Sequence, residues 1–236
     1  MGVIPYEYLT FNGKNSGDYG IWISGGGTFN APARDVSFTA VPGRNGDLLF
    51  DNDRFNNIKV TYPAFITRRF SPRIEEMRAF FSSQRGYKRL EDSYHPGEYR
   101  MAAYVSGLEV ETVQRNIAGR FDLTFNCKPQ RYLKAGEIPL PDFTAAGVIF
   151  NPTQFSAKPL VRCYGSAGSV TLNGVTVAIT DISGYADMDC ELMEVIGYNK
   201  QTTLTDGEFP VLAPGENSLS FTGFSKVVIT PRWFTI

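Results

Sequence analysis

Apolar residues along this chain recur in short runs that are separated by glycine- and proline-rich turns. In the stretch FDLTFN, residues 121–126, apolar side chains fall on one face of an extended chain and polar side chains fall on the other. Comparable strand-like runs occur at residues 7–11, 20–24, 34–41, 47–67, 87–92, 99–113 and 118–129, and again at residues 169–179, 188–198, 217–223 and 226–235. This pattern predicts a mainly β protein built of half-buried antiparallel strands.

One segment has the period of a helix instead, and the sequence predicts an α-helix over residues 72–84. Ser71 is a suitable N-cap, and Pro72 suits the first helical position. The helix carries one apolar stripe at helical spacing, formed by Ile74, Met77 and Phe81. Such a stripe must be buried, either against a sheet of the same chain or against a neighbouring subunit.

Two glycine-containing turns predict β-hairpins. Asn173-Gly174 lies between two alternating apolar runs and is typical of a two-residue type I′ turn. Residues 42–47, PGRNGD, separate two further strand-like runs and offer glycines where a positive φ is needed. The sequence therefore predicts a structural hairpin around Arg44.

The alternation is lost in residues 128–142, a proline-rich stretch that we interpret as a linker. It separates a predicted N-terminal β domain with one helix, residues 1–136, from a predicted C-terminal β-sandwich, residues 137–236. The first of these regions is rich in arginine and the second has an acidic excess. Two domains with different surroundings are the simplest explanation of that difference.

Composition narrows the class of protein. With 42% hydrophobic and 14% aromatic residues, the chain is typical of a globular protein. We expect no membrane span and no secretory signal. Cys127, Cys163 and Cys190 are widely spaced, with a single histidine, so we expect buried thiols and no metal or cofactor. The net charge of −1 hides a basic first half, but a nucleic-acid binder would normally show a larger and more clustered basic excess.

Few residues suggest chemistry. His95, beside Asp92 and Ser93, has the residue types of a hydrolase triad, but its His-Pro-Gly context predicts a turn. Asp187, Asp189 and Glu191 alternate along one predicted strand. These three carboxylates could form a calcium site, include the acid–base pair of a glycosidase, or lie on a solvated outer face of the sheet. We favour the outer face.

Three other features allow a binding role. The glycine-rich stretch Ser24 to Phe29 lacks the context of a phosphate-binding loop and is interpreted as an ordinary loop. Tyrosine and arginine interleave at residues 85–104, which is more typical of a packed sheet or a protein interface than of an RNA surface. Trp22 and Trp233 can stack on sugars if they are exposed, although tryptophans in strands usually lie in cores.

The order of these segments resembles that of siphophage distal tail proteins. In the first half the resemblance rests on VPGRNGDL, the helix at 72–84 and FDLTFNCKPQRYLKAGE. In the second half it rests on KPLVRCYGSAGSVTLNGVTVAITDISGYADMDCELMEVIGYN and on GEFPVLAPGENSLSFTGFSKVVITPRWF, which are similar to the family's galectin-like C-terminal β-sandwich. The similarity covers nearly the whole chain, although no single motif is diagnostic.

The resemblance implies a virion protein of the tail tip, assembled in the bacterial host cytoplasm, without catalytic residues or cofactors. It implies a homohexameric ring formed by N-terminal domains, which joins the major tail tube protein to the tail-associated hub protein. It further implies a channel through which DNA passes without being read, and C-terminal domains that hold receptor-binding proteins in many phages. The compact C-terminal half has no added carbohydrate-binding module, so direct binding of host sugars is not implied.

Candidate contact residues follow from this resemblance. For the subunit interface we expect the hairpin tip and the helix stripe, namely Pro42, Gly43, Arg44, Ile74, Met77 and Phe81. For another partner we expect Trp233, Asp187, Asp189 and Glu191. Two alternatives stay open: a soluble β-sandwich lectin that uses Trp233 or the acidic face, and a glycoside hydrolase that uses two of the carboxylates.

Overall fold

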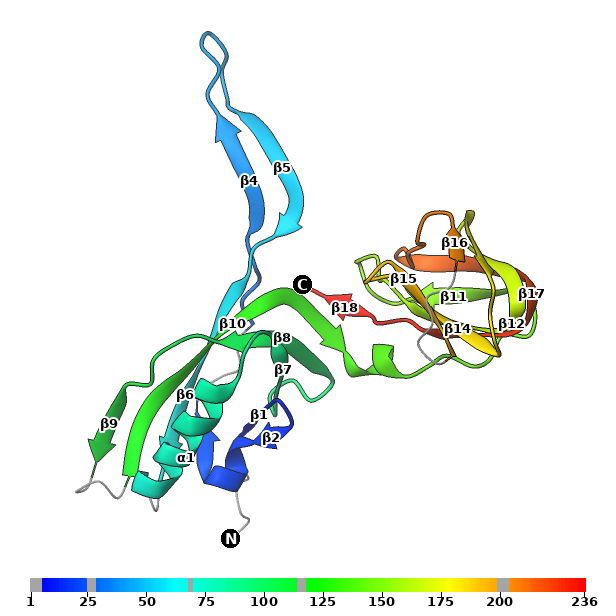
Figure 1. The fold of residues 1–236 in the computed structure, drawn as a ribbon. Helices are drawn as coiled ribbons and strands as arrows, with labels where there is room; N and C mark the ends of the chain where they lie inside the picture. The colour runs from blue at the N-terminus through cyan, green and yellow to red at the C-terminus, as the bar shows by residue number, and fades with distance from the viewer. Residues whose placement is uncertain (1–5, 25–28, 68–69, 114–117, 199–203) are drawn as a thin grey trace. The chain divides into compact units, whose positions relative to one another are not determined.

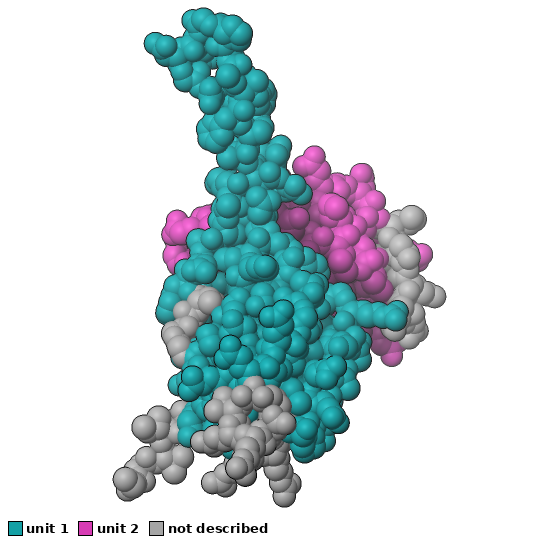
Figure 2. All heavy atoms as spheres, turned by 90° about the vertical axis from the view of Figure 1, so that its left-hand side faces the viewer, with its two compact units in different colours: residues 1–131, 236 teal, residues 132–235 magenta. Residues whose placement is uncertain are grey.

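The structure is a computed structural model that describes residues 6–24, 29–67, 70–113, 118–198 and 204–236 (Figure 1). The chain divides into two compact units, residues 1–131 with Ile236 and residues 132–235 (Figure 2). Each unit has its own cluster of buried apolar side chains. The prediction of a mainly β protein with one α-helix is confirmed.

Unit 1 is built on one antiparallel sheet whose strands follow the order β2-β1-β7-β8-β10-β6-β3, with β9 also paired to β10. The strands are β1 (Leu9–Phe11), β2 (Lys14–Asn15), β3 (Ile21–Ile23), β6 (Ile58–Ile66), β7 (Lys88–Asp92), β8 (Glu98–Tyr104), β9 (Val110–Val113) and β10 (Ala118–Leu133). A short 3₁₀ helix, η1 (Ser16–Tyr19), precedes β3. The predicted alternation in β10 is observed, because Phe121, Leu123 and Phe125 are buried.

The helix α1 (Phe70–Ser83) covers the apolar face of this sheet (Figure 1). It begins two residues earlier than predicted, so Ser71 lies inside the helix and does not cap it. Its predicted stripe is buried in the core of unit 1, where the Phe81 ring lies 5.8 Å from that of Phe125. Of the two possibilities for this stripe, a sheet of the same chain buries Ile74, Met77 and Phe81, and a role for them in a subunit interface stays a prediction.

Two strands of unit 1 stand apart from the sheet. β4 (Arg34–Thr39) and β5 (Leu48–Phe55) pair with each other in a separate two-stranded sheet. Together with the connecting residues they form a long hairpin that projects from the unit (Figures 1 and 2). We call residues 34–55 the arm. As expected, Gly43 and Gly46 in its turn have positive φ angles, of 78° and 82°.

Unit 2 contains β11 (Gly147–Asn151), β12 (Leu160–Leu172), β13 (Val175–Thr180), β14 (Tyr185–Asp189), β15 (Glu194–Gly197), β16 (Leu204–Asp206), β17 (Gly215–Thr230) and β18 (Phe234–Thr235). β12 and β17 pair along most of their length, with register shifts between Tyr164 and Ser169. Gly168 lies at this irregularity, and a Cβ there would approach the Thr222 carbonyl oxygen to 2.2 Å. The sheet curls at this point over its own core.

The ends of β12 pair with different strands. Its first half also pairs with β14 and its second half with β13, across the predicted Asn173-Gly174 turn. Asn173 and Gly174 have φ angles of 51° and 82°, as a type I′ turn requires. The division between the two units, after residue 131, falls inside the predicted linker 128–142, where β10 continues to Leu133 and a 3₁₀ helix, η2 (Lys134–Glu137), follows.

Candidate functional site

The arm exposes large apolar side chains on both of its faces. Phe38 lies opposite Leu49 on one face, and Leu48 and Phe50 lie on the other, opposite Thr39 and Ser37. Phe38 is 66% exposed, and Leu49 and Phe50 are each more than half exposed. A strand pair normally turns only one face to water, so a ribbon that is apolar on both sides indicates contact with other protein on both sides.

Ion pairs across the strands hold the base of the arm. Arg34 donates to Asp51 at 2.9 Å, and Arg54 donates to Asp35. The hydrogen bond from Arg54 lowers the pKa of Asp35. Because these pairs are largely exposed, they fix the register of the hairpin more than they stabilise the unit.

The tip of the arm carries the predicted interface residues Pro42, Gly43 and Arg44. All three are exposed, and the Arg44 backbone N–H donates to the Val41 carbonyl in the turn. The geometry leaves the Arg44 side chain accessible, so its role in an interface stays a prediction. The apolar residues along the arm were not selected from the sequence, because the run DLLF was interpreted only as a strand.

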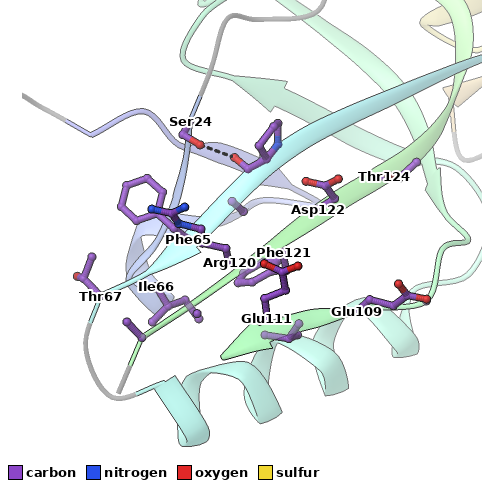
Figure 3. A pocket seen from close by; sticks show the side chains of 16 residues that line it. Ser24, Phe65, Ile66, Thr67, Glu109, Glu111, Arg120, Phe121, Asp122 and Thr124 are labelled. Carbon is purple, nitrogen blue, oxygen red and sulfur yellow. Dashed lines mark hydrogen bonds between the residues drawn. The ribbon is translucent and has the colours of Figure 1, made fainter. Parts of the chain in front are cut away.

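A groove of about 1380 Å³ lies in unit 1, lined by β6, β9, β10 and the residue after β3 (Figure 3). Ser24 lies at one side, where its hydroxyl approaches the Pro63 carbonyl at 3.4 Å. Arg120 of β10 stands opposite Glu111 of β9 in the strand register. The groove is thus bordered by charged side chains of both signs, which suits contact with a polar protein surface.

Two arginine side chains form hydrogen bonds with two of the three carboxylates on the acidic face of unit 2. Asp187 accepts two hydrogen bonds from Arg162, at 2.7 and 2.8 Å, and Asp189 accepts two from Arg232, both at 2.7 Å. The hydrogen bonds from Arg232 hold the pKa of Asp189 below its usual value, whereas a general acid needs a raised pKa. Asp187 and Asp189 are therefore paired carboxylates, and their role in binding a partner stays a prediction.

Glu191 is the remaining member of this acidic set. It lies in the turn after β14, more exposed than Asp187 and Asp189, and 3.9 Å from Arg232. Within the described ranges, no group of three or more His, Cys, Asp or Glu side chains is placed to hold a metal ion.

His95 lies in a turn, as the sequence indicates. Its Nδ1 is 3.0 Å from the Asp92 carboxylate, which also accepts a hydrogen bond from the Tyr62 hydroxyl at 2.7 Å. Burial, with Asp92 nearby, raises the pKa of Tyr62. Ser93 donates instead to the Tyr8 carbonyl at 3.0 Å, so the residues that suggested a triad serve as local hydrogen-bond partners.

Most of the other candidate residues are buried or pack against neighbouring side chains. Trp233 is buried in the core of unit 2, the position that is usual for a tryptophan in a β protein, so its ring is not open for stacking on a sugar. Arg89 lies over the Tyr99 ring at 3.8 Å, within the predicted packed sheet of residues 85–104. Of the glycine-rich stretch, residues 25–28 lie outside the described residues. Burial raises the pKa of all three thiols, Cys127, Cys163 and Cys190, to about 12.

Over the part of the chain that the structure describes, no helix has both the length and the apolar character that crossing a bilayer requires.

The chain shares its fold with solved phage Dit and baseplate proteins. No protein-family model matches the chain, and no curated protein matches it in sequence. The resemblance to this class therefore rests on the fold.

Two solved structures carry the comparison. The chain is similar to the crystal structure of SPP1 Dit (gp 19.1), described as a paradigm of the hub adsorption apparatus in Gram-positive infecting phages. The TM-score is 0.79 at 15% identity, over 98% of this chain and 100% of that chain. It is also similar to a chain of the phage p2 baseplate in its activated conformation with Sr, with a TM-score of 0.53 at 9% identity, over 95% and 96% of the two chains.

Proposed function

We propose that the protein is a structural component of the tail tip of a long-tailed phage. In this proposal six copies form a ring through their first units, and the ring joins the tail tube protein to the tail-associated hub protein. DNA passes through the central channel without being read, and the second units face other tail components. Copies assemble in the cytoplasm of the bacterial host, and the ring transforms no substrate.

The exposure of the arm is the observation that carries this proposal. A hairpin that pairs with no other described strand and is apolar on both faces is poorly suited to a monomer in water. Contacts that close by rotation give each copy one donor surface and one acceptor surface, and the arm is suited to be the donor. The fold shared with SPP1 Dit and with the p2 baseplate chain supports the same role.

The lectin alternative has less support. Its proposed stacking residue, Trp233, lies in the core, and its proposed carboxylates are held by arginines. A hydrolase has the further difficulty that the pKa of Asp189 is lowered. We therefore give the structural role precedence over both.

The test is the oligomeric state of the purified 26.2 kDa chain, measured by size-exclusion chromatography with light scattering and by negative-stain microscopy. We expect the mass of a hexamer and a six-fold annulus. Replacing Phe38 and Phe50 by serine is expected to shift the mass to that of a monomer while the thermal unfolding midpoint is retained, because both side chains are exposed.

A matched control is available in unit 2. Phe150 of β11 is 65% exposed, close to the 66% of Phe38, so Phe150→Ser removes a similar apolar side chain outside the arm. This variant should keep the oligomer. The proposal would be abandoned if the unmodified chain were a monomer at micromolar concentration.

A further inference from the structure

An asparagine that is followed by glycine is the sequence context in which the backbone most readily attacks an asparagine side chain. The chain contains three such pairs, at residues 12–13, 45–46 and 173–174. We propose that Asn45, at the tip of the arm, is a site of spontaneous deamidation in a copy that contacts no other copy, and that the folded structure protects Asn12 and Asn173. This inference goes beyond the proposed function, because it assigns to the arm a covalent change that needs no other tail component.

The reaction needs water and no other reactant. The backbone nitrogen of Gly46 attacks the Cγ atom of Asn45, the new C–N bond closes a cyclic imide, and the side-chain nitrogen leaves as ammonia with the proton of the attacking N–H. Water then cleaves one of the two bonds between the imide nitrogen and its carbonyl carbons, with the hydroxyl going to carbon and the proton to nitrogen. Cleavage at Cγ gives aspartate, and cleavage at the main-chain carbonyl gives isoaspartate. Glycine favours the attack, because it has no Cβ and leaves the backbone its widest choice of conformation.

Asn173 is held by hydrogen bonds at both polar atoms of its side chain. Its Nδ2 donates to Oδ1 of Asn217 at 2.6 Å, and its Oδ1 accepts from the Ser218 backbone N–H at 3.0 Å. Its own backbone N–H donates to the Ser218 carbonyl at 3.0 Å, in the two-residue turn between β12 and β13. Bringing Cγ toward the Gly174 nitrogen requires the side chain to leave these partners, so the turn disfavours the attack.

Asn12 is held in a similar way, in the turn between β1 and β2. Its Nδ2 donates to Oε1 of Gln84, the residue after α1, at 2.8 Å. Its backbone N–H donates to the Arg89 carbonyl of β7 at 2.8 Å. The φ of Asn12 is 47°, close to the 51° of Asn173, as a two-residue turn between paired strands requires. Attack in this turn likewise has to break contacts with other elements.

Asn45 lacks restraints of this kind. It is exposed, and within the described part of the chain its side chain forms no hydrogen bond. Residues 40–47 connect β4 to β5, and a backbone hydrogen bond from the Arg44 N–H to the Val41 carbonyl lies within this connection. A Cβ at Gly46 would meet nothing within 4 Å, so water reaches this segment freely. The side chain of Asn45 therefore has few contacts to lose before it reacts.

Deamidation changes the charge of the tip. Arg44 and Asp47 are the charged residues of the connection and both are exposed, so its formal net charge falls from zero to −1. The new carboxylate follows Arg44 directly in the chain, and it competes for the guanidinium with any acidic group of another molecule. A deamidated arm is thus a weaker match to an acidic surface than a new one.

The test compares the three pairs within one molecule. The variant Phe38→Ser with Phe50→Ser, whose arm is expected to be free, is incubated in mildly alkaline buffer and digested at intervals. Liquid chromatography with mass spectrometry then measures aspartate and isoaspartate at positions 12, 45 and 173. The same variant in urea gives the rates without folded structure. Asn45→Gln in the same variant identifies the signal of position 45, because the longer side chain forms the corresponding ring much more slowly.

We expect Asn45 to deamidate at least about tenfold faster than Asn12 and Asn173 in the folded variant, since its side chain has no hydrogen bond to break. In urea the three rates should agree within about threefold, because the pairs then differ only in their neighbours. Similar rates at the three positions of the folded variant would overturn the inference and leave the proposed function standing. An Asn45 that stays intact in the folded variant while it reacts in urea would do the same.

The chain with its natural Phe38 and Phe50 separates the two proposals. If neighbouring copies cover the tip of the arm, Asn45 should deamidate more slowly in this chain than in the variant, while positions 12 and 173 keep their rates. An equally fast reaction at Asn45 in both proteins would confirm the deamidation site and place the tip outside the proposed interface.

Discussion

At the scale of single residues, Asp189 of unit 2 shows that a carboxylate which suggests catalysis or metal binding in the sequence can have a structural role. Asp189 lies among donors on two sides, the guanidinium of Arg232 and the backbone of the following turn. Each of these donors favours the charged carboxylate, which is why its pKa is lowered. The residue therefore braces a turn and stays ionised.

Replacing Asp189 by asparagine should lower the free energy of unfolding by about 2 kcal/mol at pH 7, because Arg232 is left half-buried without its counter-ion. The lowered pKa of Asp189 determines how the free energy of unfolding depends on pH. The stabilisation is present above the unfolded-state pKa of about 3.9 and is lost as the pH falls through the lower folded-state value. Urea unfolding of both proteins between pH 7 and pH 3 measures this difference.

The control is Glu191→Gln, since Glu191 is more exposed and lies 3.9 Å from the same arginine. It should change the stability by less than about 0.5 kcal/mol. An effect of Asp189→Asn that is equally small at pH 7 would show that the pair does not stabilise the unit.

Met77→Ala tests whether the helix stripe serves the core of unit 1 or a subunit interface. The side chain is 1% exposed, so its truncation should cost about 2–5 kcal/mol, as for other buried methionines and leucines. Guanidinium unfolding of the variant measures the loss. Glu76→Ala, on the exposed side of the helix, is the control. If Met77→Ala instead abolished the oligomer and left the unfolding midpoint unchanged, the stripe would be an interface after all.

At the scale of elements, η2 depends on a close approach of two backbone segments. Gly136 is buried, and a Cβ at this position would lie 2.3 Å from the Trp233 backbone nitrogen. The Gly136 carbonyl also accepts a hydrogen bond from the Arg232 N–H at 2.8 Å, which fixes the two segments together. No side chain can be added here without separating them.

Gly136→Ala should therefore destabilise unit 2 by about 1–3 kcal/mol or more, because the clash is with backbone and cannot be relieved by a rotamer change. Thermal unfolding monitored by tryptophan fluorescence reports on it through Trp233. Gly97→Ala, where a Cβ would meet nothing within 4 Å, is expected to be neutral. Equal midpoints for the two variants would disprove the close approach.

The sequence allowed the helix and the hairpin at Asn173-Gly174 to be predicted, because both are set by local period and turn chemistry. The end of β10 was missed, since the loss of alternation and the prolines after Cys127 obscured a strand that continues to Leu133. The C-terminal end of β10 depends on pairing with strands distant in the sequence, and the local pattern of a single sequence does not report such pairing.

The candidate surfaces were predictable only in part. The turn around Arg44 was identified from its glycines, but the exposure of Phe38, Leu49 and Phe50 depends on the absence of a covering element among the described strands. Likewise, Phe81 in α1 and Trp233 just before β18 are apolar residues, and only the tertiary arrangement places them in cores. Periodicity shows which side chains share a face, whereas burial depends on what that face meets.

At the scale of the whole molecule, the two units have separate cores that share no residue. A fragment that begins at Tyr132 and runs to the end of the chain should therefore fold alone, as domains of about 100 residues commonly do. We expect a cooperative thermal transition by circular dichroism and a monomeric mass by light scattering, because the arm belongs to unit 1. A fragment that forms hexamers would move the assembly interface to unit 2.

The arm, which is apolar on both faces, also has a consequence for the fate of copies that do not assemble, if neighbouring copies cover it as proposed. An unassembled copy then keeps exposed apolar strands, so surplus copies should aggregate or be degraded by host proteases. Under that proposal, synthesis of the chain must match the number of assemblies made. Short-lived unassembled copies would limit the build-up of incomplete assemblies.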